Sequence, residues 1–355
     1  MSCPDCEKSK ALGYKFCIKC GENFAETAIV PEHSIDNNSL FGEASLHRMA
    51  LPAVLVYIIA IIVSIGIVLV EFEPTFQYVE TKSIKLFIYL WDSIVLGTLS
   101  GSWIQVWWVF ITTMALICTG LVLYQSRNAF KIDSENYVSQ TKKTPIFWLG
   151  LSFGSILCIE IIISLIASAC GANVSVPSGL VGLDKEWAVF LFAEAGVNEE
   201  IVFRVFWFGI PMMIVALIYR DKHFLRYLWG GFGASKVAVL FLILSSIIFA
   251  CAHVEGWGLW KLFTVLPGGL IMGYLYMRFG LHASIMFHLI NDLMAVWTME
   301  SEILGSVLMM LILLTGAICV PLLLKKTWKG MNNFKNLPLT GLEDQEEENN
   351  DSSLD

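Results

Sequence analysis

Three short groups of polar residues interrupt segments of this sequence that are otherwise apolar. The first group reads Glu199-Glu200-x-x-x-Arg204, where x is any residue. Glu200 and Arg204 are four positions apart with the acid first, which is the favourable order for an ion pair on one helix face. Glu199 points about 100° away around the same helix and has no such partner in its own segment. It must therefore face a cavity, a metal or a group from another helix.

The second and third groups add imidazoles to this carboxylate. Phe249 and His253 are four positions apart, as are His288 and Asp292, and Asn291 precedes Asp292. A carboxylate can take a proton from water, imidazoles can hold that water or a metal, and an acid or amide can polarise a carbonyl. Taken together, these residue types predict a hydrolytic site. Taken singly, a buried Glu–Arg pair or an intramembrane histidine is more often structural.

The elements that carry these groups must lie in a membrane. Of the 355 residues, 56% are hydrophobic and only 15% are charged, against about 25% charged in soluble domains. So little charge cannot cover a soluble surface, which excludes a cytosolic globular enzyme, a disordered chain and a nucleic-acid-binding protein. The net charge of −8 comes mainly from seven acids between Glu343 and Asp355.

Eight segments are long and apolar enough to cross a hydrocarbon core of about 30 Å as helices. If both termini are cytosolic, the inner segments hold eighteen Lys and Arg residues and the outer segments four, as the positive-inside rule requires. We therefore predict an all-α, multi-pass bundle of about eight helices in the cell membrane, with cytosolic N- and C-termini. The expected spans are residues 49–70, 104–125, 146–169, 187–219, 236–254, 260–278, 281–299 and 303–324.

Two stretches depart from a simple helical span. Residues 86–101 contain Asp92 and several Gly and Ser residues. We expect this stretch to be interfacial or re-entrant, because counting it as a span would place the basic 126–144 loop outside. Residues 187–219 would be about 50 Å long as one straight helix. Pro211 is therefore expected to kink or end that helix.

Four cysteines near the N-terminus form two C-x2-C pairs, Cys3 with Cys6 and Cys17 with Cys20. This spacing predicts a small zinc ribbon, whose metal would supply the folding free energy that so short a segment cannot obtain from a core. Redox dithiols or free cysteines are the alternative. Thiolate ligands need a reducing compartment, which places the N-terminus in the cytosol. The expected organisation is a ribbon (1–24), a linker (25–46), N-terminal helices with a cytosolic loop (47–144), a catalytic membrane core (145–324) and an acidic tail (325–355).

In their order along the chain, the three polar groups resemble the signature of the CPBP family of intramembrane proteases. This family includes CAAX prenyl endopeptidases and bacteriocin-processing or self-immunity (Abi) proteins. Its pattern is Glu-Glu-x-x-x-Arg, then Phe-x-x-x-His, then His-x-x-x-Asn/Asp, and all three occur here in apolar segments. Each motif is weak alone, but the ordered set is specific. The resemblance covers about residues 145–300.

The resemblance implies a role for each matching residue. Glu199 resembles the catalytic carboxylate, which works with His253 to activate water. Glu200 and Arg204 resemble the supporting ion pair.

His288 and Asp292 match the positions proposed to stabilise the oxyanion. This chain has the aspartate variant, and an ionised aspartate cannot donate a hydrogen bond. Asp292 must therefore be protonated, bind a metal, or act through Asn291. Whether the site is a metal centre or a glutamate-and-histidine site stays open at this point.

We therefore predict an intramembrane endopeptidase of the CAAX-prenyl-protease type. Its partners would be membrane lipids and a protein or peptide substrate, lipidated chains included, and no nucleic acid. The zinc ribbon would recruit a partner or substrate. The rival hypothesis is a transporter or immunity-type scaffold that uses the buried charges structurally, although no inverted-repeat symmetry supports a transporter. A catalytically inactive relative is a third hypothesis, against which the intact Glu199, His253 and His288 argue.

Overall fold

The computed structural model describes residues 48–89, 93–127 and 143–341. The chain divides into two compact units, Met1–Arg48 and Met49–Asp355, and the fold below is that of the second. The predicted zinc ligands Cys3, Cys6, Cys17 and Cys20 lie outside the described residues, so the zinc ribbon stays a prediction.

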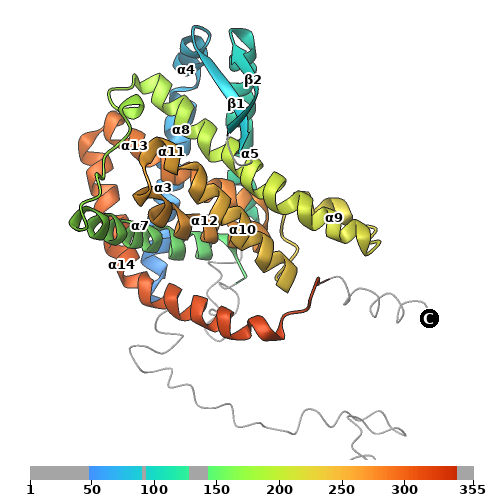
Figure 1. Cartoon of the computed structure of the whole chain (residues 1–355). Helices are drawn as coiled ribbons and strands as arrows, with labels where there is room; N and C mark the ends of the chain where they lie inside the picture. The colour runs from blue at the N-terminus through green and yellow to red at the C-terminus, as the bar shows by residue number, and fades with distance from the viewer. Residues whose placement is uncertain (1–47, 90–92, 128–142, 342–355) are drawn as a thin grey trace, which may run out of the picture. The chain divides into compact units, whose positions relative to one another are not determined.

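The described residues form a helical membrane bundle, as the sequence predicts (Figure 1). Seven helical segments are long and apolar enough to cross a membrane by length and composition. The expected span 281–299 forms helix α13 but is not among the seven, because polar site residues lower its hydropathy. The helices are α3 (Leu51–Val70), α4 (Phe72–Val79), α5 (Ser102–Gln125), α7 (Pro145–Ala169), α8 (Lys185–Glu200), α9 (Ile210–Ile218), α10 (Lys236–Ala252), α11 (Val254–Trp257), α12 (Trp260–Phe279), α13 (Leu281–Glu300) and α14 (Glu302–Asn333), with short 3₁₀ turns at Ser178–Leu180, Phe224–Leu228 and Phe334–Asn336.

Helix α13 lies at the centre of the bundle. It packs against α3, α5, α7, α8, α12 and α14, and every residue from Ala283 to Ile290 is buried. Gly196 brings α8 close to it, because a Cβ at this position would lie 2.6 Å from the Cα of Leu289. This close approach sets the end of α8, which carries Glu199 and Glu200, beside the polar face of α13.

The segment expected to kink at Pro211 is interrupted earlier. After α8 ends at Glu200, residues Ile201–Gly209 form a π-helical segment, η3, which leads into α9. Pro211 lies in the first turn of α9, directly after η3, so the helix does not end there and the kink stays a prediction. Segments of π-helix are rare and are frequently found at functional sites. Here the segment starts directly after the two glutamates.

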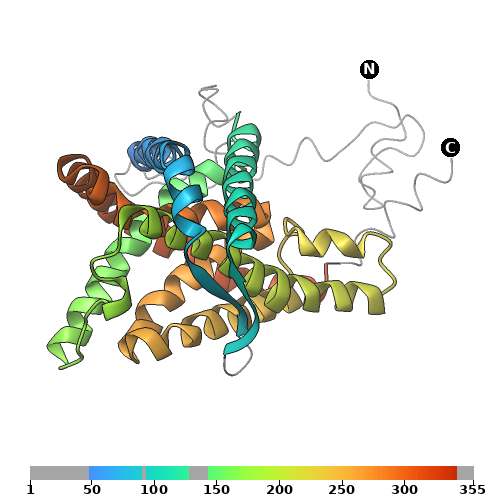
Figure 2. The same cartoon turned by 90° about the horizontal axis from the view of Figure 1, so that it is seen from above.

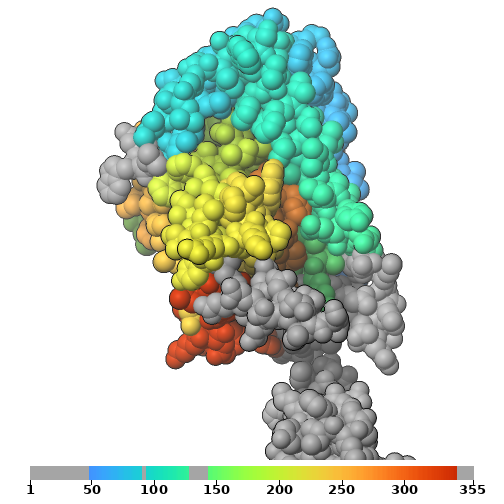
Figure 3. Space-filling view, turned by 90° about the vertical axis from the view of Figure 1, so that its right-hand side faces the viewer, coloured from blue at the N-terminus to red at the C-terminus, as the bar shows by residue number. Residues whose placement is uncertain are grey.

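Most of the 86–101 stretch belongs to a β-hairpin rather than to a helix. Strand β1 (Ser83–Tyr89) pairs antiparallel with β2 (Ser93–Ser100), and this is the one sheet within the described ranges. The Nε1 of Trp207, in η3, donates a hydrogen bond of 2.7 Å to the backbone oxygen of Tyr89. Figures 2 and 3 show the hairpin lying against the yellow-green segment that contains η3. The hairpin therefore reaches the region just beyond Glu200.

Helices α10 and α12 approach closely through glycines. A Cβ at Gly269 would lie 3.1 Å from the ring of Phe249, and one at Gly273 would lie 3.0 Å from Leu242. These two glycines are four residues apart on α12, the Gly-x-x-x-Gly spacing that lets membrane helices pack closely. It holds α10, and with it the second polar group, against the core.

Candidate active site

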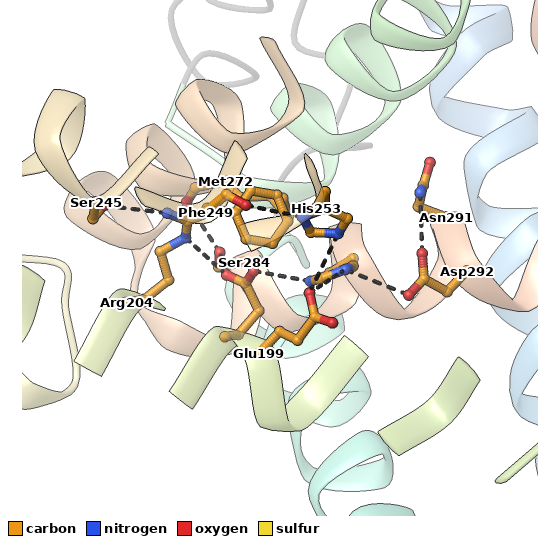
Figure 4. Close-up of polar contacts among 11 residues, drawn as sticks. Glu199, Arg204, Ser245, Phe249, His253, Met272, Ser284, Asn291 and Asp292 are labelled. Atoms are coloured by element: carbon orange, nitrogen blue, oxygen red, sulfur yellow. Dashed lines mark hydrogen bonds and ion pairs between the residues drawn. The ribbon is translucent and has the colours of Figure 1, made fainter. Parts of the chain in front are cut away.

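The three polar groups meet at one place, although they come from three helices (Figure 4). Glu199 and Glu200 lie at the end of α8, and His253 caps the end of α10. His288 and Asp292 lie on one face of α13. The close approaches of α8 to α13 and of α10 to α12 bring these helix ends together.

Glu199 faces both imidazoles. Its Oε2 lies 3.8 Å from Nε2 of His253 and 3.8 Å from Nε2 of His288. This oxygen is buried and has no hydrogen-bond partner among the described residues. A separation of 3.8 Å is too long for a direct hydrogen bond, but one water can bridge Glu199 to either imidazole. The side chains of Glu199 and His253 are 22% and 20% exposed, so the site is open to a cavity.

The orientation of His253 follows from its other nitrogen. Nδ1 lies 2.9 Å from the backbone oxygen of Phe249. A carbonyl oxygen only accepts hydrogen bonds, so we assign the proton of the neutral ring to Nδ1. The Nε2 lone pair of His253 then points toward Glu199.

His288 is fixed from both sides by carboxylates. Its Nδ1 lies 3.0 Å from Oε1 of Glu200, and its Nε2 lies 3.4 Å from Oδ2 of Asp292. Asn291 donates from Nδ2 to the other oxygen of Asp292, at 3.2 Å. Asp292 therefore has a nitrogen neighbour at each of its oxygens.

Glu200 is fully buried and is neutralised by Arg204, which is also fully buried. Arg204 donates from Nε to Oε2 of Glu200 at 3.1 Å, and from Nη1 to the hydroxyl of Ser245 at 3.2 Å. Ser284 donates its hydroxyl to the same oxygen of Glu200. Burying a charge is tolerated only with such pairing and hydrogen bonding. This network gives His288 a rigid acceptor.

Phe249 forms the aromatic wall of the site. Its ring stands edge-to-face to His253 and His288, with centroid separations of 4.7 and 5.6 Å. The Arg204 guanidinium lies 5.3 Å from the same ring. Such contacts hold both imidazoles in place and exclude water from one side of the ion pair.

Two cavities adjoin Glu199 and His253. The main cavity, about 330 Å³, lies on the side of α12 and α13 and also contains Asn291 and Asp292. The hairpin cavity, about 230 Å³, is bounded by Phe87 of β1 and by η3. Glu199, His253 and Trp257 line both. The reactive groups are therefore reached from two sides, as an extended chain crossing them would require.

Sequence reasoning missed several residues of this site. Ser284 lies four positions before His288, and Ser245 lies four positions before Phe249, so the four-residue spacing of a helix face is the signal that points to both. Glu160 lines the main cavity. Lys261 also lines this cavity, and the sequence gives no local signal for it.

The donor geometry does not fit a metal. No three His, Cys, Asp or Glu side chains in the described parts of the chain are placed to hold one ion. The 3.8 Å separations around Glu199 exceed the roughly 3.4 Å between ligands of a tetrahedral zinc with bonds near 2.05 Å. The site is better suited to holding water through hydrogen bonds.

One family model matches the part of the chain that contains the site. Residues 186–294, less than a third of the chain, match a family model described as Type II CAAX prenyl endopeptidase Rce1-like. The matched segment runs from α8 into α13 and contains all three polar groups. No curated protein and no solved structure matches the chain. Together with the apolar helices, the match indicates a multi-pass, membrane-embedded peptidase.

Proposed function

We propose that this membrane-embedded peptidase cleaves CAAX-type proteins with a water activated by Glu199 and His253. The observation that carries the proposal is the buried Oε2 of Glu199, which has no hydrogen-bond partner in the described residues and faces two imidazole nitrogens at 3.8 Å. An unsatisfied buried carboxylate oxygen is costly, so the arrangement favours a bound polar group. Water is the smallest group that can bridge this oxygen to an imidazole nitrogen.

The first step needs two acceptors for the water. Glu199 Oε2 and the bare Nε2 of His253 each accept one of its hydrogens, which leaves an oxygen lone pair directed at the substrate. As that oxygen bonds to the carbonyl carbon of the scissile peptide, its proton passes to Glu199, which acts as the general base. His253 keeps the remaining hydroxyl oriented.

The second requirement is a donor for the oxyanion that develops on the carbonyl oxygen. His288 lies among Glu199, Glu200 and Asp292, and these carboxylates favour its imidazolium form. Its Nε2–H is the donor that we assign to the oxyanion. Asp292 is then an acceptor that orients His288, rather than a donor itself.

The tetrahedral intermediate then collapses. The carbon–nitrogen bond breaks, and the proton held by Glu199 passes to the leaving amine, which restores the carboxylate. The carbonyl re-forms as the new carboxyl group of the substrate. No atom from outside the water, the peptide and these side chains is needed.

The N-terminal cysteines have a separate part in the proposal. Cys3, Cys6, Cys17 and Cys20 would hold one structural zinc ion, and the resulting ribbon would recruit a partner or substrate on the cytosolic side. The positive-inside distribution supports cytosolic termini.

The test is cleavage of a prenylated CAAX peptide by the full-length protein in lipid vesicles, read by mass spectrometry of the released tripeptide. Glu199→Gln should lower turnover by about 100-fold or more, the range for loss of a general base. The matched control is Glu194→Gln, the same change on the same helix and in the same cavity. Near-normal cleavage by the Glu199→Gln variant would remove Glu199 from this role. A wild-type protein without peptidase activity would instead favour a scaffold.

A further inference from the structure

One cation in the main cavity takes no part in the proposed chemistry. Lys261 lines this cavity together with Glu199, His253 and Asp292, and it is the one Lys or Arg among the described residues that does so. It lies in the first turn of α12, one of the helices apolar enough to span a membrane. Ionisable side chains in such segments are rare and usually functional.

Lys261 forms no ion pair within 4 Å in the described parts of the chain, although Glu160 and Asp292 are near enough to interact with its charge. Its ammonium group lies 4.1 Å from the ring centre of Trp257 and 5.6 Å from that of Trp260. Aromatic faces stabilise a cation without neutralising it. By contrast, Arg204, the buried cation of the same core, is paired with Glu200. The charge of Lys261 is therefore available to a ligand.

The position of Lys261 on its helix strengthens this point. The N-terminal end of a helix carries a partial positive charge, so a cation in the first turn is disfavoured and an anion is favoured. Lys261 adds its charge to this end of α12. The two together attract an anion to this part of the cavity.

Four acids line the cavity, and none of them forms an ion pair with Lys261 within 4 Å: Glu160, Glu194, Glu199 and Asp292. Asp292 faces His288 and Asn291. Glu160 lies beside Gly268, where a Cβ would be 3.3 Å from its Oε1. Neither acid forms an ion pair with Lys261 in the described structure.

We propose that Lys261 binds the C-terminal carboxylate of the substrate, so that the main cavity holds the peptide that is released. This inference rests on the proposed function. A CAAX-type substrate ends a few residues beyond its modified cysteine, and its free carboxylate is the one anion that every such chain carries. Trp257 lines both the main cavity and the hairpin cavity, as Glu199 and His253 do, and it also contacts Lys261. It thus connects the reacting groups to the carboxylate site.

The test crosses two peptides with two enzymes. Matched prenylated peptides end in a free carboxylate or in a carboxamide, and kcat/KM is measured for the wild type and for Lys261→Met. The wild type should prefer the acid by about 10- to 100-fold, the range of one hydrogen bond between charged groups. Lys261→Met should lose this preference because its kcat/KM falls for the peptide with the free carboxylate and stays the same for the peptide with the carboxamide. Lys261→Arg should retain most of the preference.

Lys82→Met is the control. Like Lys261, Lys82 lies over two aromatic rings, those of Tyr78 and Trp187, but it lines neither the main cavity nor the hairpin cavity. It should leave the preference unchanged. A binding measurement with the Glu199→Gln protein gives a readout without turnover, and there the acid peptide should bind more tightly than the amide.

The outcomes separate this inference from the proposed function. If the wild type cleaves both peptides equally, Lys261 does not bind the carboxylate, although the peptidase assignment holds. If Lys261→Met slows both peptides by the same factor, the side chain acts on the fold or on the reacting groups, and the inference is wrong. If neither peptide is cleaved and neither binds, the proposed function fails as well.

Discussion

The buried pair of Glu200 and Arg204 makes the most direct prediction about what holds the site together. Replacing Arg204 with Met removes one charge from a fully buried ion pair whose Nε–Oε2 distance is 3.1 Å. Glu200 would keep two neighbours, Ser284 and His288, but would lose its full positive partner. Glu200 would then share its one remaining cationic neighbour, His288, with Asp292 in the centre of the bundle.

The expected loss is large. Breaking a buried ion pair by removing one partner costs about 3–5 kcal/mol in stability. The double variant Glu200→Gln/Arg204→Met removes both charges. Its glutamine oxygen can still accept from His288 and its amide can donate to the Ser284 hydroxyl, so no buried group is left unpaired. We expect the double variant to be destabilised by only about 1–2 kcal/mol.

The assay is thermal or denaturant unfolding of the wild type, both single variants and the double variant in one detergent. The double variant should be more stable than Arg204→Met, because it no longer contains the Glu200 carboxylate without its Arg204 partner. It should nevertheless cleave poorly, because His288 has lost the carboxylate that orients it and favours its imidazolium form. If Arg204→Met unfolds like the wild type, or the double variant is no more stable than Arg204→Met, the ion pair is not what stabilises the core.

Two further predictions concern helix packing and the N-terminal segment. Gly196→Ala should lower both stability and cleavage, because its Cβ would lie 2.6 Å from the Cα of Leu289 and would push α8 away from α13. Gly120→Ala is the matched control, since a Cβ there has no neighbour within 4 Å, and it should unfold like the wild type. Equal melting temperatures for the two alanine variants would contradict this account. Replacing Cys3 and Cys17 with Ser should reduce bound zinc, measured by plasma mass spectrometry, from about one ion per chain to near zero. Cleavage of a short peptide should change little, and unchanged zinc content would refute the ribbon.

Much of the site was predictable because its pairs are local. Residues four apart share a helix face whatever the tertiary structure. Glu200 with Arg204, Phe249 with His253, and His288 with Asp292 could therefore be paired from the sequence alone. The same spacing points to Ser284, which was overlooked. Apolar length predicted the helices for an equally local reason, since a membrane span needs about 20 apolar residues.

The interpretation of Asp292 shows what spacing leaves open. Its place on the helix face was known, but three chemical roles remained. The contacts with His288 and Asn291 present donors to both of its oxygens, and these contacts favour the role of an orienting acceptor. The order of residues within a motif does not tell which atoms point at each other.

The sequence by itself determined the membrane class, the helical segments and the three polar groups, because hydropathy and helical periodicity depend only on neighbours in the chain. Tertiary structure decided the rest. How far one helix slides past another depends on contacts such as Gly196 with Leu289, and only that offset brings Glu199 to 3.8 Å from both imidazoles. The hairpin beside η3 and the placement of Lys261 in the cavity arise in the same way, from packing between segments that are distant in sequence.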